Sequence, residues 1–91
     1  MSAMSNLATG DRSATRAEVL AARSALRQLA GRYGLSHPRV DVAGTVIVHT
    51  TDPGYATLMR YAEAAAKTIG AWVNVISDDA PAAQQADTEQ L

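Results

Sequence analysis

Two stretches of the chain space their apolar residues at helical intervals, and a glycine follows each stretch. The first set comprises Val19, Ala22, Leu26, Leu29 and Tyr33. The second comprises Tyr55, Leu58, Ala62, Ala65 and Ile69. Such spacing puts each set on one face of a helix. Gly34 and Gly70 suit the left-handed position just past a helix end. The pattern therefore predicts two amphipathic helices, each with one face for packing.

The starts of both helices carry capping signals. Thr15 and Glu18 have the spacing of a capping box, in which each side chain accepts a hydrogen bond from a free backbone N–H. Thr51 or Asp52 is suited to cap the second helix, and Pro53 is favoured at a first helical position. We therefore expect the helices to begin near Thr15 and Asp52.

The chain between and after the helices predicts strands. β-Branched residues are concentrated between Arg39 and Thr50, with Gly44 among them. We expect a hairpin of Arg39–Val42 and Thr45–Thr50, with one bent strand as the alternative. Ala71–Ser77 predicts a third strand, which the sequence Asp78-Asp79-Ala80-Pro81 ends.

The resulting fold class is α/β, of the α+β two-layer kind, in the order helix–strand–strand–helix–strand. Two helices would pack on one face of a three-stranded sheet. We expect a disordered leader over residues 1–14, a single domain over 15–79, and a flexible, acidic, Ala/Gln-rich tail over 80–91. The other sheet face would carry Trp72, Asn74 and Ile76, or instead Val73 and Val75. We expect this face to be left bare and to bind a partner.

Composition excludes several classes of protein. A length of 91 residues allows one small domain. The absence of cysteine rules out a disulfide framework and a thiolate metal site. No apolar run reaches the roughly 18 residues of a membrane span, and the N-terminus lacks a signal-peptide pattern. We therefore expect a cytoplasmic protein without membrane contact.

Charge is divided unevenly along the chain, although the net charge is −1. Residues 1–39 hold six arginines against two acidic residues, and the acidic excess lies in residues 40–91. At about 100° per residue, Arg16, Arg23 and Arg27 align on the first helix, with Leu20 among them. We call these three arginines the arginine stripe. Such a stripe can bind carboxylates of a protein partner or the phosphates of a nucleic acid.

Motifs for catalysis and cofactor binding are missing from the sequence. It contains no phosphate-binding glycine loop and no G-x-S-x-G nucleophile motif. His37 and His49 lack metal-ligand spacing. We therefore predict no catalytic, cofactor-binding or metal residues. The remaining enzyme hypothesis is an Mg²⁺-dependent, nucleotide-binding activity that uses Asp52, Asp78, Asp79 and His49.

Parts of the sequence resemble the minimal nucleotidyltransferase domains found in many bacterial toxin–antitoxin pairs. The resemblance runs over Leu26–Val40, from Asp52-Pro-Gly-Tyr55 through the second helix, and over Val73-Asn-Val-Ile76. Together these segments span somewhat less than half of the chain.

Three departures affect the positions that carry the chemistry of that family. Asp41-Val-Ala-Gly44 stands where the family has a Gly-Ser loop. The family's paired carboxylates would fall near Gly44 and Val46, and its third carboxylate near Asn74. The resemblance thus implies a scaffold that has lost nucleotidyl transfer and kept a capacity to bind.

These observations favour a non-catalytic protein-interaction module without a cofactor. We expect it to bind a protein partner or a second copy of itself, as an antitoxin-like subunit does. The predicted partner-binding residues are Arg16, Leu20, Arg23, Arg27, Trp72, Asn74 and Ile76. The alternatives are a small nucleic-acid-associated regulator that uses the arginine stripe, and the Mg²⁺-dependent enzyme described above.

Overall fold

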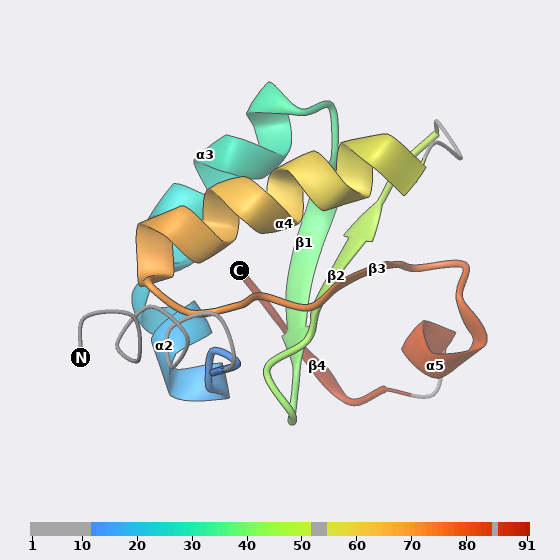
Figure 1. Ribbon diagram of the computed structural model, residues 1–91. Helices are drawn as coiled ribbons and strands as arrows, with labels where there is room; N and C mark the ends of the chain where they lie inside the picture. The colour runs from blue at the N-terminus through green and yellow to red at the C-terminus, as the bar shows by residue number, and fades with distance from the viewer. Residues whose placement is uncertain (1–11, 52–54, 85) are drawn as a thin grey trace.

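The computed structural model describes residues 12–51, 55–84 and 86–91 (Figure 1). Along the chain it forms α2 (Arg16–Ala21), α3 (Arg23–Arg32), β1 (Ser36–Asp41), β2 (Val46–His49), α4 (Tyr55–Ile69), β3 (Val75–Ser77), α5 (Pro81–Gln84) and β4 (Thr88–Gln90). No helix within these residues has the length and apolar character needed to cross a membrane.

The capping box predicted at the start of the first helix is confirmed. The backbone N–H of Glu18 donates to the Thr15 hydroxyl at 3.1 Å, and the Thr15 N–H donates to the Glu18 carboxylate at 3.0 Å. The predicted single helix is instead two, because the backbone leaves helical geometry at Ala22 (φ −98°, ψ 14°). The helical face is nevertheless retained, since Val19 in α2 and Leu26 in α3 are both fully buried.

The strands form one mixed sheet in the order β3-β2-β1-β4. β1 and β2 are antiparallel neighbours, so the predicted hairpin is confirmed and the bent-strand alternative is wrong. β2 and β3 run parallel and are joined through α4, which crosses in front of the strands in Figure 1. This β2–α4–β3 unit requires a helical crossover because parallel strands cannot be joined by a tight turn.

The sheet has one strand more than the sequence predicted. β4 pairs antiparallel with the outer edge of β1, and α5 precedes it, within the segment expected to be a flexible tail. The predicted leader also differs at its end, because Ala14 is buried and its N–H donates to the Trp72 carbonyl at 2.8 Å. Residues 1–11 of that leader lie outside the described residues. Segments this short carry too little periodicity to predict an element.

The main core lies between the three longer helices and one face of the sheet. Its buried members include Val19, Leu26, Ala30, Val40, Val46, Val48, Tyr61, Ala65, Val73 and Leu91. Ala30 and Ala65 are almost inaccessible to solvent, so the helices can lie close to the small sheet.

The predicted third strand, Ala71–Ser77, is shorter in the structure, because β3 begins only at Val75, so Trp72 and Asn74 precede the strand. Ile76 is the cross-strand partner of Ile47 and lies on the opposite face of the sheet. Val73 and Val75 instead pack in or against the main core. The expectation that this opposite face is bare is wrong at its centre. Ile47 alternates with the core residues of β2 and is nevertheless fully buried.

The side chain of Arg39 accounts for part of this cover. Arg39 is the cross-strand partner of Ile47, and its guanidinium lies 3.4 Å from Asp78, just past the end of β3. Because β2 lies between β1 and β3, the Arg39 side chain crosses β2 on the face to which Ile47 points. Its aliphatic stem can shield apolar surface while its charged end is paired.

Candidate functional site

The arginine stripe contacts β4 of the same chain. Arg16 Nη2 lies 2.7 Å from Glu89 Oε1, and Arg23 Nη2 lies 3.9 Å from Glu89 Oε2. Arg23 also donates a hydrogen bond to the Gln90 carbonyl, and Arg27 donates one to the Leu91 backbone oxygen at 3.4 Å. The three arginines predicted to bind a partner therefore bind an extended segment of the same chain, which carries Glu89.

The register of β4 explains how Glu89 meets these arginines. Glu89 pairs with Val40, whose side chain lies in the core under the helices. Cross-strand partners share a sheet face, so Glu89 points toward α2 and α3. Leu91 follows two positions later, on the same side, and is only 5 % exposed. Its N–H donates to the Pro38 carbonyl at 3.0 Å, which extends the ladder.

We refer to the outer edge of β1 together with the arginine stripe as the strand site. It combines main-chain partners on β1, positive charge on α2 and α3, and an apolar position for Leu91. The side chains of Arg16 and Arg23 remain 40 % and 45 % exposed, so their ion pairs are worth about 0–1 kcal/mol each. Burial of Leu91 contributes more, about 1.5–3 kcal/mol before the entropy of ordering is counted.

One polar atom at the strand site is left unsatisfied. Arg16 Nε is buried and has no hydrogen-bond partner among the residues that the structure describes. An unpaired buried donor of this kind costs free energy that a suitably placed acceptor recovers. β4 thus fills the strand site but leaves one of the site's hydrogen-bond donors, Arg16 Nε, without an acceptor among the described residues.

The other predicted partner-binding residues are divided between two surfaces. Leu20 packs against the core in part, beside the arginine stripe. Trp72 is 39 % exposed and Asn74 is exposed, whereas Ile76 is half-buried. Asn74 Nδ2 donates to the Thr45 hydroxyl at 3.4 Å. The structure therefore does not gather the predicted residues into one site.

A small polar cluster lies at the ends of β2 and β3. His49 Nδ1 is 3.1 Å from Asp78 Oδ2, and Arg39 Nη2 lies 3.4 Å from the same oxygen. Asp79 is exposed and Asp52 lies outside the described residues. Within the part of the chain that the structure describes, no three His, Asp or Glu side chains converge on a metal position.

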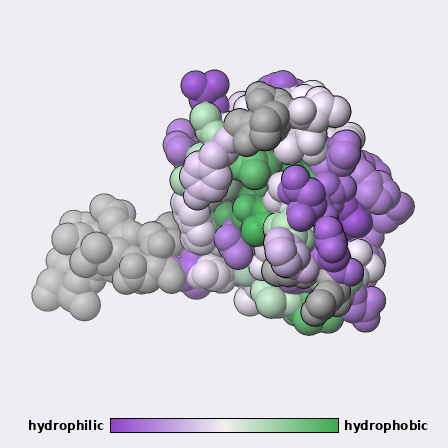
Figure 2. Space-filling view, turned by 90° about the vertical axis from the view of Figure 1, so that its right-hand side faces the viewer, coloured by the Kyte–Doolittle hydropathy of each residue, from purple (hydrophilic) through white to green (hydrophobic). Residues whose placement is uncertain are grey.

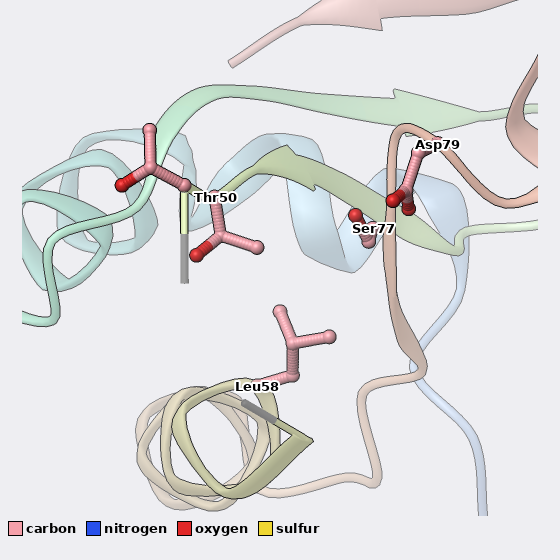
Figure 3. Close-up of a pocket in the computed structure, with 5 residues that line it drawn as sticks. Thr50, Leu58, Ser77 and Asp79 are labelled. Carbon is pink, nitrogen blue, oxygen red and sulfur yellow. The ribbon is translucent and has the colours of Figure 1, made fainter. Parts of the chain in front are cut away.

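A hollow of about 320 Å³ lies at the same end of the parallel strands, between them and α4. Thr50, Thr51, Ser77 and Asp79 line it from the strand ends, and Leu58 points into it from α4 (Figure 3). Figure 2 views the molecule from the side on which β2 ends, where apolar atoms lie at the bottom of a depression rimmed by polar residues. Crevices at the carboxyl ends of parallel strands are frequent ligand sites in α/β sheets.

The residues of β4 were missed by the sequence analysis. The uneven charge distribution could have indicated this contact, because the arginines lie in the first helix and acidic residues lie near the end of the chain. The alternation of acidic Glu89 and apolar Leu91 was a second signal, because side chains two apart share a strand face. Three residues are too few for either signal to predict a strand.

No family model, curated protein or solved structure matches this chain. The resemblance to minimal nucleotidyltransferases accordingly stays a prediction.

Proposed function

We propose that this protein is a non-catalytic protein-interaction module that binds an extended segment of its partner at the strand site. The observation that carries the proposal is the way β4 is held. β4 adds to the β1 edge through its backbone, Glu89 meets Arg16 and Arg23, and Leu91 is buried. The partner segment would present an acidic residue and, two positions later, an apolar one.

This arrangement has the properties of recognition by strand addition. Main-chain hydrogen bonds to a sheet edge supply affinity, and positions for alternate side chains supply specificity. The unpaired Arg16 Nε gives a partner a means to bind more tightly than β4 does, by supplying an acceptor that β4 lacks. The module would then exchange its own strand for that of the partner.

The same contacts weigh against the nucleic-acid alternative. Arg16 is paired with Glu89, and a phosphate would have to displace that carboxylate and then meet the acidic charge beside it. Proteins that bind nucleic acid through phosphates normally have a clearly basic surface. An acidic protein segment is therefore the better match to the arginine stripe.

A labelled peptide with the sequence of residues 86–91 tests the strand site in trans. In the wild-type chain the tethered β4 competes at an effective concentration of about millimolar. In a Glu89→Arg chain the introduced arginine replaces attraction to the stripe by repulsion, so that β4 competes less well for the site. We expect fluorescence anisotropy to show the peptide binding to the Glu89→Arg chain at least about tenfold more tightly than to the wild type.

Two controls make this experiment decisive. A peptide that carries arginine at the position of Glu89 should bind the Glu89→Arg chain much more weakly. A Leu91→Ser chain frees the site without adding charge and should also bind the unaltered peptide. Circular dichroism confirms that each chain is folded. Equal binding of both peptides, or no binding by either freed chain, would refute the proposal.

An antitoxin-like role is part of this proposal and has a separate test. We expect co-expression of this chain to relieve growth arrest caused by a toxin-like protein encoded in the adjacent reading frame. Arg16→Glu should abolish the relief, whereas Arg32→Glu, an exposed change elsewhere on α3, should preserve it. Relief that is insensitive to Arg16→Glu would show that the strand site is not the surface involved.

A further inference from the structure

We infer that the strand site of one copy accepts β4 from a second copy, so that the protein forms a strand-exchanged dimer at high protein concentration. The inference rests on the proposed function, because it uses the same site, and it names the partner as this chain itself. β4 is the one segment that the structure shows seated there.

Exchange conserves the contacts of β4. The ion pair of Glu89 with Arg16, the hydrogen bond from Arg27 and the burial of Leu91 form equally well within one copy or between two. Exchange of an identical element costs little free energy for this reason. The segment that connects β4 to the rest of the fold then decides the equilibrium between monomer and strand-exchanged dimer. That segment follows α5, a helix of one turn that ends at Gln84.

β4 can leave the sheet without disturbing the other strands. β4 is at the outer end of the strand order, paired with β1 alone. Its departure leaves the pairing of β1 with β2, and of β2 with β3, intact. The remaining fold therefore loses one short strand and one buried side chain. The exposed edge of β1 would then be an unpaired edge, which favours pairing with another chain.

The strand site and the strand that would exchange carry opposite charges. The stripe is basic and the segment from Asp87 to Glu89 is acidic, so the surfaces that meet on exchange carry opposite charge. When β4 leaves its own site in each of two copies, the arginine stripe of one copy can pair with the acidic strand of the other. The ion pair between Arg16 and Glu89 is the closest of these contacts, at 2.7 Å, against 3.9 Å for Arg23.

A charge-reversal pair tests the exchange with full-length chains. Arg16→Glu in one copy and Glu89→Arg in the other each oppose the seating of β4 within one molecule. In a strand-exchanged heterodimer both sites again hold opposite charges. Each restored surface pair is worth a factor of about 2 to 5 in the equilibrium constant. We expect native mass spectrometry of the mixture to show the heterodimer about tenfold above the level that random pairing gives.

The double variant Arg16→Glu/Glu89→Arg is the matched control, because it restores the opposite charges within one chain. It should show the same monomer–dimer balance as the wild type. The wild type itself should show a dimer fraction that increases with concentration in light scattering. A disulfide between Asp41→Cys and Thr88→Cys, which are cross-strand partners, should lock β4 in place and give covalent dimers when formed at high concentration.

The outcomes separate this inference from the proposed function. If the peptide of residues 86–91 binds the Glu89→Arg chain but the charge-reversal mixture gives no excess heterodimer, strand exchange is wrong and the strand site stands. If neither is observed although all chains are folded, both are wrong. Heterodimer formation that persists when Leu91 is replaced by serine in both copies would also contradict exchange, because β4 would have lost its apolar anchor.

Discussion

The hydroxyl of Tyr61 donates a hydrogen bond to the Leu26 carbonyl at 3.0 Å and so joins α4 to α3 inside the core. Both residues are fully buried, and burial raises the pKa of Tyr61 to about 12. The ring of Tyr61 also meets that of Tyr33 edge to face, with centroids 6.4 Å apart. The largest buried side chain thus fixes the spacing of the two helices by both packing and a directed bond.

Replacing Tyr61 by phenylalanine should lower the free energy of unfolding by about 0.5–1.5 kcal/mol, because the ring is kept and the hydrogen bond is lost. Tyr61→Ala should cost about 3–5 kcal/mol, since it also leaves a cavity. Urea denaturation measures both changes. Tyr55→Phe is the matched control, because Tyr55 is 72 % exposed, and it should have no measurable effect. Equal effects of the two phenylalanine variants would contradict this account of the core.

Gly44 and Gly31 should respond to alanine in opposite directions. Gly44 has φ +93°, and a Cβ built there would lie 2.9 Å from the Ala14 carbonyl oxygen. Gly44→Ala should therefore destabilise the fold by about 2 kcal/mol or more. Gly31 is helical, with open space around its Cβ position, so Gly31→Ala should stabilise by roughly 0.5–1 kcal/mol. Thermal melts of both variants check the sign, and a stable Gly44→Ala chain would show that the turn does not approach Ala14 so closely.

Glu18 should contribute a pH-dependent component of stability. Hydrogen bonds from the Arg12 side chain and from the Thr15 backbone lower the pKa of Glu18 from 4.5 to about 2. Because the folded state favours the carboxylate, this contribution is present above about pH 4.5 and is lost as the pH falls toward 2. We expect the urea midpoint of the wild type to fall more steeply than that of Glu18→Gln across this range. Glu63→Gln, on an exposed part of α4, should keep the wild-type slope.

Leu91 should contribute more than Glu89 to the free energy of unfolding. Leu91→Ala removes a buried side chain and should cost about 2 kcal/mol. Glu89→Gln removes a half-exposed ion pair and should cost less than about 1 kcal/mol, with a smaller loss still at high salt. Denaturation at two salt concentrations separates the contributions. A larger loss for Glu89→Gln would mean that charge, and not apolar burial, holds β4.

The sequence alone determined the elements whose signals are local. The capping box at Thr15 and Glu18 predicted the helix start, and the helical spacing from Val19 to Tyr33 predicted the buried face. The hairpin around Gly44 followed from β-branched residues on either side of a turn. These predictions succeeded because hydrogen bonds and side-chain periodicity act over a few residues.

The tertiary structure alone decided which residues the arginine stripe contacts and which strand forms the edge of the sheet beside β1. The partner of Arg16 is Glu89, 73 positions away, and no local pattern relates two such positions. β4 exists because the edge of β1, the positive charge of the helices and an apolar position for Leu91 meet in space. A three-residue segment has little strand preference of its own, so its conformation is set by the surface that receives it.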